Sequence, residues 1–318
     1  MSEAKYEIVF GPVPSRRLGQ SLGINNIPPK HCSLSCVYCQ LGCTTQMGVT
    51  RQTFYEPELL ARAVEAKLQE TTAQGGAVDY LTFVADGEPT LDRNLGREIA
   101  LLKPLGIKVA VISNTTLLWR GDVRNDLSQA DLVSLKVDAV DERAWLRINR
   151  PHGSLSLHHV QQGMLAFAAA YRGTLITETM LVRGVNDGES GVRATAAFLR
   201  DLKPARAYLA VPIRPPAEHW VQAPSRQAIN RAYMILCASV AHVECLVEHE
   251  ADNFVSTGQV STDLMSIMSV HPMREQAVVE LLTRAGADWS VVENLVAQGK
   301  LTKQRFEGVD FYQRRFDA

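Results

Sequence analysis

The stretch "KHCSLSCVYCQLGC", residues 30–43, holds four of the six cysteines in a chain of 318 residues. The other two, Cys237 and Cys245, lie far downstream. Thiolates bind soft metals, and clustered cysteines in a reducing compartment are more often metal ligands or redox groups than a disulfide framework. We therefore expect residues 30–43 to form a metal or redox site that the rest of the fold supports.

The composition and the amino terminus indicate a cytoplasmic protein without membrane association. The first residues, "MSEAKYEIVF", lack the basic start and the apolar stretch of a signal peptide. No apolar run reaches the roughly eighteen residues that a membrane span needs. Thiols stay reduced in the cytosol. The net charge of −1 and the pI of about 6.7 provide no overall positive field to attract nucleic acid or an anionic membrane.

Strand-like and helix-like segments alternate after the cysteines. Strands are predicted over 21–27, 78–86, 108–114, 130–140, 174–182, 206–213 and 242–248, and helices over 57–72, 94–106, 142–149, 156–172, 189–204 and 225–240. Such alternation is typical of an α/β fold with a parallel sheet covered by helices. Roughly six strand–helix units predict a partial (β/α)6 TIM-type barrel, with its active loops at the carboxyl ends of the strands.

The last part of the chain has a different pattern. Two short helices that each stop at a glycine, 277–286 and 288–300, precede two strands that turn at "EGVD", 307–310. This order predicts a small winged-helix-like domain over 265–318, joined by a linker over 251–264 to a barrel over 1–250. From His271 onward there are seven Lys or Arg and seven Asp or Glu residues. A DNA-reading module usually has a basic face, so we expect a lid, a peptide-recognition surface or a dimerisation element rather than DNA binding.

Polar residues gather where the predicted strands end. They are Asp86, Gly87, Glu88 and Pro89 after the second strand, Ser113 and Asn114 after the third, Lys136 and Asp138 on the fourth, and Glu178 on the fifth. Lys136 and Asp138 are two positions apart and share a strand face. A glycine permits close backbone approach. Because the carboxyl ends of parallel strands meet at one edge, these residues predict a ligand site next to the cysteines.

The spacing of the cysteines limits the kinds of metal site that they could form. Cys32, Cys36 and Cys39 form C-x3-C-x2-C, and three cysteines in so short a segment converge on one compact site. A zinc ribbon would pair such a knuckle with a second Cys or His pair. Cys237 and Cys245 have apolar neighbours and are interpreted as small buried hydrophobic residues. His31, next to Cys32, is interpreted as a structural residue.

This spacing, with Tyr38 just before the last cysteine, resembles the signature of the radical S-adenosylmethionine (SAM) superfamily. The resemblance implies that Cys32, Cys36 and Cys39 hold a [4Fe–4S] cluster whose fourth iron is left for SAM. Reductive cleavage of SAM would then give a 5′-deoxyadenosyl radical that abstracts hydrogen from a substrate. Cys43 would not be a ligand, because a fourth thiolate would exclude SAM.

Longer motifs support the resemblance. The segments "DGEPTL", "ISNTT", "VSLKVDAVDERAWLRINRPHG" and "MLVRGVND" look like the wybutosine-synthesising radical SAM enzymes and their prokaryotic relatives, called iron–sulfur oxidoreductases. The match covers residues 8 to 215. It implies a SAM site that includes Tyr38, Gly87, Glu88, Asn114 and Asp138. This chain has no flavodoxin-like domain and no cysteine cluster before residue 32, so the wybutosine substrate is not carried over.

Arginines suggest an anionic group on the substrate. The candidates are Arg16 and Arg17 near the amino terminus, and Arg147, Arg150, Arg183 and Arg214 after later strands. Arginine binds carboxylates and phosphates bidentately. The alternative is that these arginines form salt bridges with the acidic residues, which are almost equal in number to the basic ones.

The sequence thus predicts a radical SAM enzyme that needs an electron donor such as flavodoxin or ferredoxin. An RNA nucleoside is slightly favoured as substrate, with a peptide, a protein or a small metabolite as alternatives. A remote alternative is a non-catalytic zinc-binding regulator that uses the four clustered cysteines and binds DNA through the winged helix. That alternative leaves "DGEP", "SNTT" and the barrel pattern unexplained.

Overall fold

A computed structural model of the chain describes residues 8–84, 86–247, 254 and 258–315. Its main sheet has eight strands in the order β1-β2-β5-β6-β7-β8-β9-β10. Their bounds are β1 Val9–Ser15, β2 Gly19–Ile24, β5 Tyr80–Phe83, β6 Lys108–Ser113, β7 Leu132–Lys136, β8 Thr174–Met180, β9 Arg206–Ala210 and β10 Val243–Leu246. Only the pairing of β1 with β2 is antiparallel among these neighbours, and every other pair is parallel.

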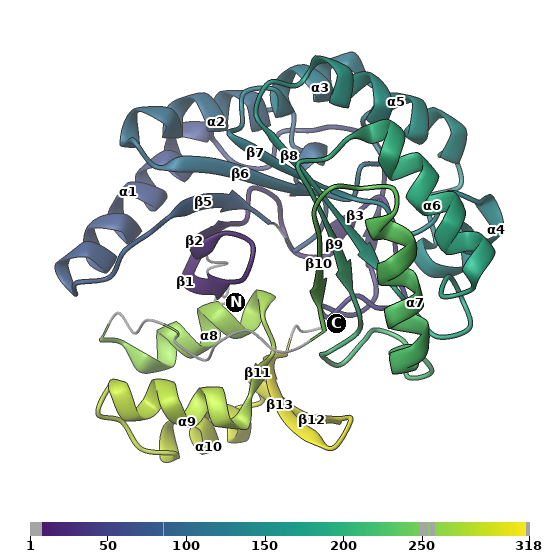
Figure 1. The fold of residues 1–318 in the computed structure, drawn as a ribbon. Coiled ribbons are helices and arrows are strands. Elements are labelled where there is room, and N and C mark those ends of the chain that lie inside the picture. The colour runs from purple at the N-terminus through teal and green to yellow at the C-terminus, as the bar shows by residue number, and fades with distance from the viewer. Residues whose placement is uncertain (1–7, 85, 248–253, 255–257, 316–318) are drawn as a thin grey trace.

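Helices cover the convex face of this sheet, which arches across the molecule in Figure 1. They are α1 Pro57–Ala73, α2 Leu95–Leu102, α3 Gly121–Leu127, α4 Glu142–Asn149, α5 Leu157–Ala170, α6 Glu189–Leu202 and α7 Arg226–Cys237, with 3-10 turns at Pro89–Leu91 and Lys103–Leu105. Strand residues such as Phe83, Val111 and Leu135 pack against helix residues such as Phe167 and Leu199. The expected parallel sheet with helices outside it is therefore confirmed, as a curled partial barrel.

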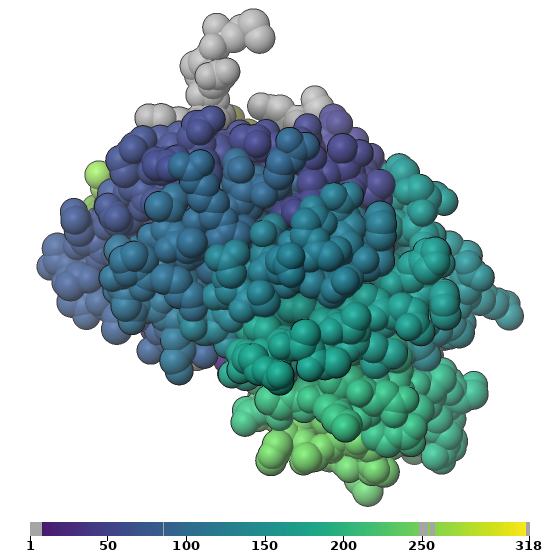
Figure 2. All heavy atoms as spheres, turned by 90° about the horizontal axis from the view of Figure 1, so that it is seen from above, coloured from purple at the N-terminus to yellow at the C-terminus, as the bar shows by residue number. Residues whose placement is uncertain are grey.

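The units follow one another around the molecule. In the space-filling view of Figure 2 the helical surface passes in chain order from purple and blue to teal and green. Short connections between parallel strands place consecutive strands side by side in the sheet. The carboxyl ends of the strands consequently meet at one edge, where the loop with the clustered cysteines also lies.

The opposite end of the barrel is closed by apolar packing. Leu18, in the turn between β1 and β2, is buried among Ala110, Leu132, Ile176 and Tyr208. These four residues lie on β6, β7, β8 and β9 and face away from the helices. The interior is therefore blocked at this end, and ligands must reach it from elsewhere.

Two elements of the barrel were not expected from the sequence. Strand β1 contains Gly11 and Pro12, which are depleted in strands, and its register is irregular between Phe10 and Val13. An edge strand tolerates such residues because one side needs no ladder hydrogen bonds. Helix α3 has seven residues, of which only Val123 and Leu127 are buried, so its apolar periodicity is too short to recognise.

The carboxyl-terminal appendage contains α8 Val260–Val270, β11 Met273–Arg274, α9 Glu275–Arg284, α10 Ser290–Ala297, β12 Leu301–Phe306 and β13 Val309–Arg314. The hairpin of β12 and β13 turns where the sequence predicted, at Glu307 and Gly308, which both have positive φ. Helix α8 begins at Val260, before the predicted domain start at 265. Residues 251–253 and 255–257 of the predicted linker lie outside the described residues.

The appendage packs on the inner side of β1. Phe10 and Val13 share an apolar cluster with Leu264, Ile267 and Met268 of α8. In Figure 1 the appendage lies across the open side of the arch, next to β1 and β2. Across the described ranges, no helix is both long enough and apolar enough to cross a membrane.

Candidate functional site

The cysteine loop connects the end of β2 to α1, with the short strands β3 His31–Cys32 and β4 Gln46–Met47 paired within it. The loop rests on the end of α4. The amide of Val37 donates to the Ile148 carbonyl at 2.9 Å, and the amide of Ser35 donates to the Asn149 carbonyl at 3.0 Å. Leu34 and Val37 are buried in the cluster that contains Ile148. These contacts hold the loop over the carboxyl edge of the barrel.

Among the thiols of Cys32, Cys36 and Cys39, two accept hydrogen bonds from asparagine side chains. Asn114 Nδ2 donates to Cys32 Sγ at 3.4 Å, and Asn149 Nδ2 donates to Cys36 Sγ at 3.4 Å. Burial raises the pKa of the Cys32 thiol far above its usual value, and the neighbouring Cys36 raises it further. Burial also raises the pKa of Cys36 to about 12, with a contribution from Asp138. Thiolates at these positions therefore need a positively charged centre between them.

That requirement fits an iron–sulfur cluster, which is held by cysteine thiolates and has hydrogen bonds to its sulfurs. Among the residues that the structure describes, no three His, Cys, Asp or Glu side chains surround one point closely enough for a single metal ion. A [4Fe–4S] cluster takes each thiolate at a different iron. Cys43 is exposed. The His31 ring contacts the Pro29 carbonyl at 3.2 Å and the edge of Phe54, in agreement with a structural role.

Glu88 joins the loop after β5 to the end of β6. Its Oε1 accepts from Thr90 N at 3.1 Å and from Ser113 Oγ at 2.8 Å, and its Oε2 accepts from Asn114 N at 2.7 Å. Burial raises the pKa of Glu88, while these donors lower it. The carboxylate therefore holds Asn114 where its side chain reaches Cys32, in addition to any contact with a ligand.

Gly87 lies directly against the cysteine loop. A Cβ at this position would be 1.8 Å from the carbonyl oxygen of His31. The next amide, of Glu88, donates to that same oxygen at 3.0 Å. Only glycine permits this approach, so the strand end and the residue before Cys32 are joined through their backbones. Pro89 follows and begins the 3-10 turn Pro89–Leu91.

Asp86 is 2% exposed, and its backbone is fixed on both sides. Its amide donates to Asn25 Oδ1 at 3.2 Å, and its carbonyl accepts from Lys30 N at 2.7 Å. Neither side-chain oxygen has a hydrogen-bond partner. Burial raises the pKa of Asp86 well above its usual value, and Arg314 of β13 partly opposes this. Asp86 is consequently a buried acid without a side-chain hydrogen-bond partner among the described residues, at the junction of barrel and appendage.

Asp138 organises the end of β7. It accepts hydrogen bonds from the Tyr38 hydroxyl, from Asn149 Nδ2 at 2.7 Å and from Met180 N at 2.8 Å. Burial raises the pKa of Tyr38 well above its usual value, and Asp138 adds to this. The Tyr38 hydroxyl therefore stays protonated and fixes the ring beside Cys39.

Below Tyr38, three charged side chains form a row toward the floor of the barrel. Lys136 Nζ lies 4.8 Å from the centroid of the Tyr38 ring and pairs with Glu178, which also pairs with Arg17. Although burial raises the pKa of Glu178, Arg17 and Lys136 lower it to about 2. Burial lowers the pKa of Lys136, but Glu178 and Asp138 raise it by more. Lys136 is therefore a cation and not a free nucleophilic amine.

The structure separates the six candidate arginines. Arg17 alone among them reaches the row with Glu178, and Arg16 is exposed. Arg147 donates to the Gly184 carbonyl at 2.8 Å, and Arg150 pairs with Glu218. These two lie on the outside of α4 with protein partners.

Arg183 is held in the same way, since its Nε donates to the Ala223 carbonyl at 2.9 Å. Arg214 is different. It lies beside the cysteine loop, where Nη1 donates to Gln40 Oε1 at 3.3 Å and Nη2 contacts His271 Nε2 at 3.1 Å. Neither Arg183 nor Arg214 belongs to the row with Glu178.

Two residues of the site, Asn149 and Gln40, were not predicted from the sequence. Asn149 is the last residue of α4 and bonds both Cys36 and Asp138. The available signal was a polar residue on the buried face of an amphipathic helix, within "RINRPHG". Gln40 follows Cys39 and had no local signal, because its partners lie more than a hundred residues away.

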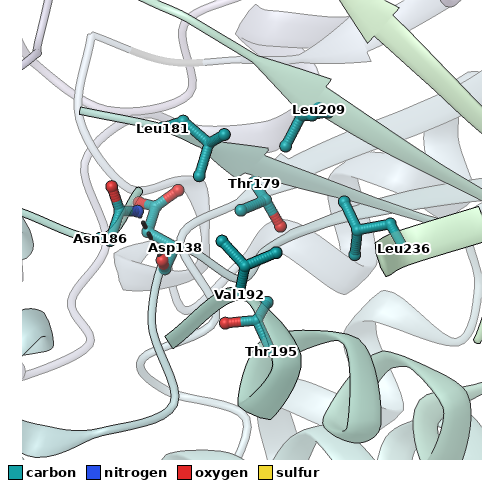
Figure 3. A pocket seen from close by; sticks show the side chains of 8 residues that line it. All are labelled: Asp138, Thr179, Leu181, Asn186, Val192, Thr195, Leu209 and Leu236. Atoms are coloured by element: carbon teal, nitrogen blue, oxygen red, sulfur yellow. Dashed lines mark hydrogen bonds between the residues drawn. The ribbon is translucent and has the colours of Figure 1, made fainter. Parts of the chain in front are cut away.

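A small cavity lies behind Asp138, in the layer between the sheet and α6 and α7 (Figure 3). Its volume is about 10 Å³, close to that of one water molecule. Asn186 donates to the Asp138 carbonyl at 2.8 Å on one side, and Leu209 and Leu236 lie on the other. This cavity belongs to the core and has no room for a substrate.

The fold and the thiol-lined loop define the class of protein. Residues 26–193 match the Radical SAM superfamily, and the chain belongs to it. It is an enzyme of the radical SAM class, and the cofactors of this class are a [4Fe–4S] cluster and SAM. The resemblance drawn from the sequence is thus confirmed, and the enzyme is favoured over the zinc-binding regulator.

Within this superfamily the chain is a member of the UPF0026 family. It is 44% identical over 313 residues to UPF0026 protein MJ1312 of Methanocaldococcus jannaschii, covering 98% of this chain and 97% of the relative. It is 30% identical over 318 residues to a UPF0026 protein of Helicobacter pylori, covering 98% and 99%.

Two solved structures have a similar fold. A radical SAM methyltransferase from Sphaerobacter thermophilus has a TM-score of 0.58 at 17% identity, covering 73% of this chain and 68% of that one. TYW1 with a lysine-pyruvate adduct bound has a TM-score of 0.52 at 17% identity, covering 69% and 74%. At this identity the similarity concerns the fold alone.

Proposed function

We propose that Cys32, Cys36 and Cys39 are the ligands of the cluster and that Cys43 is not. The observation that carries this assignment is the convergence of the loop on Asn114 and Asn149, whose amides donate to two of the thiols. Cys43 is exposed. Three thiolates leave one iron of a [4Fe–4S] cluster without a protein ligand, which is the arrangement that SAM chemistry requires.

SAM would lie across the carboxyl ends of β5, β6 and β7. The proposed contacts are Tyr38 of the cysteine loop, Asp86, Gly87, Glu88 and Pro89 after β5, Ser113 and Asn114 at the end of β6, Lys136 and Asp138 at the end of β7, and Glu178 of the neighbouring strand β8. When bound and reduced, the cluster supplies an electron that cleaves SAM to a 5′-deoxyadenosyl radical, which abstracts hydrogen from the substrate. Glu88 positions Asn114, Asp138 positions Tyr38, and the surrounding apolar core excludes water.

The substrate would occupy the interior above Arg17, Glu178 and Lys136. The rim arginines had favoured RNA, but Arg147, Arg150 and Arg183 bond to protein groups. The charge argument for RNA is therefore weaker. We favour a small molecule whose anionic group would face Arg17 and Lys136, two cations that share the single carboxylate of Glu178. RNA remains the second candidate, and it predicts an affinity that falls steeply with salt.

The division of the chain into a barrel over 1–250, a linker over 251–264 and an appendage over 265–318 remains our proposal. The order α8, β11, α9, α10, β12, β13 and the sheet order β11-β13-β12 support a winged-helix-like module. Its neutral charge supports a structural role over DNA binding. A flavodoxin or ferredoxin is the proposed source of the electron.

Anaerobic reconstitution tests the ligand assignment. We expect about four irons per chain, loss of the cluster and of reductive SAM cleavage in Cys36→Ala, and retention of both in Cys43→Ala. Iron and sulfide analysis, the visible spectrum and 5′-deoxyadenosine formation measure these outcomes. A brown, SAM-cleaving Cys36→Ala protein would contradict the assignment, and so would loss of the cluster in Cys43→Ala.

A further inference from the structure

Gln40 is bonded to two distant parts of the chain, although it directly follows the proposed ligand Cys39. Its Nε2 donates to the carbonyl of Val270 at 2.8 Å, and its Oε1 accepts from Arg214 Nη1 at 3.3 Å. Val270 is the last residue of α8, in the appendage. The last carbonyls of a helix have no partner within the helix. The Gln40 amide therefore supplies a donor that the end of α8 requires.

The same junction contains a second link between barrel and appendage. Arg214, in the segment after β9, also contacts His271 Nε2 at 3.1 Å. The His271 ring in turn packs edge-on against Phe254. Gln40 and Arg214 therefore hold the carboxyl end of α8 from the barrel side. Gln40 is the residue directly after the proposed cluster ligand Cys39.

The appendage is anchored at separate places, so it cannot slide freely over the loop. Phe10 of β1 packs with Ile267 of α8 in the shared apolar cluster. Val84, after β5, packs against the same cluster. Because α8 packs against β1, the carbonyl of Val270 at its end is held next to the cysteine loop.

We propose that Gln40 is a positioning residue through which the appendage holds the Cys39 side of the cluster loop. This inference rests on the proposed ligation by Cys32, Cys36 and Cys39. It gives the appendage a function in the site itself, as a cap that fixes the loop from the open side of the barrel. The turn between Cys36 and Gly42 is closed by backbone hydrogen bonds of 3.0 and 3.1 Å around Cys39. Within the part of the chain that the structure describes, Gln40 is the side chain of this turn that bonds to the appendage.

The test uses the reconstituted full-length protein and three variants. Gln40→Ala removes both bonds. Gln40→Glu keeps an acceptor for Arg214 but cannot donate to the Val270 carbonyl. Gln161→Ala is the matched control, because Gln161 Nε2 donates to the Val140 carbonyl at 2.9 Å away from the cysteines.

The measurements are the rate of iron release to a ferrous chelator and the electron paramagnetic resonance signal of the reduced cluster with and without SAM. A net hydrogen bond corresponds to about a two- to tenfold change, so we expect release to be faster by that factor in Gln40→Ala and Gln40→Glu. We also expect an altered signal in both, and wild-type behaviour in Gln161→Ala.

Wild-type release and signal in Gln40→Ala would overturn the inference. Wild-type behaviour in Gln40→Glu alone would overturn the role of the hydrogen bond to Val270, because the link to Arg214 would then suffice. If the wild-type protein itself gave no iron–sulfur cluster, the proposed function would fail instead, whatever the variants did.

Discussion

The site requires a residue without a side chain at position 87, which is Gly87. Gly87 lies where the end of β5 contacts the carbonyl of His31. A Cβ at this residue would be 1.8 Å from the carbonyl oxygen and would overlap it. The neighbouring Glu88 uses both carboxylate oxygens on Thr90, Ser113 and Asn114. The motif "DGEP" therefore stabilises the cysteine loop and the end of β6 even before any ligand binds.

We expect Gly87→Ala to destabilise the protein by about 1–3 kcal/mol, as overpacking does, and to reduce iron uptake because His31 precedes Cys32. Thermal unfolding and iron content after reconstitution measure the two effects. Gly153→Ala is the control, since a Cβ at Gly153 meets nothing within 4 Å. Equal iron content and equal melting temperatures for the two variants would contradict the expectation.

At the scale of elements, helix α2 carries a buried acid under the loop that follows β5. Glu98 is fully buried, and its Oε2 accepts from Asn26 Nδ2 at 3.2 Å. The same amide donates to the Pro89 carbonyl at 3.2 Å. Burial raises the pKa of Glu98 to about 9, and nearby Asp92 contributes to the rise. The helix is therefore fastened to the site loop by a carboxyl group that is protonated at neutral pH.

This arrangement predicts that the free energy of unfolding falls as pH rises from about 4.5 to about 9, the ordinary and the folded pKa of Glu98. In that window the folded chain retains a proton that the unfolded chain has released, so raising the pH favours unfolding. The slope from one group is at most about 1.4 kcal/mol per pH unit. Urea unfolding at several pH values measures it.

Glu98→Gln keeps the hydrogen-bonding shape without the titration, so we expect it to flatten this dependence. Glu58→Gln provides the comparison, because Glu58 lies at the surface in a pair with Arg97. An unchanged slope in Glu98→Gln would show that other groups, such as Asp92, account for the pH dependence.

For the whole molecule, the appendage and the barrel share one apolar cluster, which closes the open side of the arch. Phe10 is 2% exposed at the boundary, although it belongs to the barrel strand β1. Its ring also lies against Gly23 of β2, where a Cβ would come within 2.0 Å of it. The two parts should consequently unfold together.

Phe10→Ala tests this coupling. Removing a buried phenylalanine costs about 3–5 kcal/mol, and we expect the loss to appear in both parts. Trp289 of the appendage contacts Tyr312, whereas Trp119, Trp145 and Trp220 lie in the barrel. With those three replaced by phenylalanine, tryptophan fluorescence reports on the appendage, and the cluster absorbance reports on the barrel. Phe198→Ala, on the outer helix α6, removes a barrel contact only, so in a coupled molecule it should shift the two transitions together as well. An appendage transition that stayed at the wild-type midpoint in Phe10→Ala would contradict the coupling.

Local sequence patterns predicted the parts of the fold that depend on near neighbours. Apolar periodicity predicted the alternation of strands and helices. Cys32, Cys36 and Cys39 are close in the sequence, so a single loop can bring their side chains together. Even the turn at Glu307 and Gly308 was visible in "EGVD". Strand β1 was missed because Gly11 and Pro12 are tolerated only at an edge, and the sequence does not say which strand is at an edge.

What the sequence by itself determined is the class of chemistry, through three cysteines and the strand-end motifs of a radical SAM barrel. What only the tertiary structure decided is which residues complete the site. It placed Asn149 on Cys36, tied most of the rim arginines to protein groups, and brought α8 onto Gln40. The physical reason is that a hydrogen bond between residues 40 and 270 depends on packing of the whole chain, and such long-range contacts leave no periodic trace in the sequence around either partner.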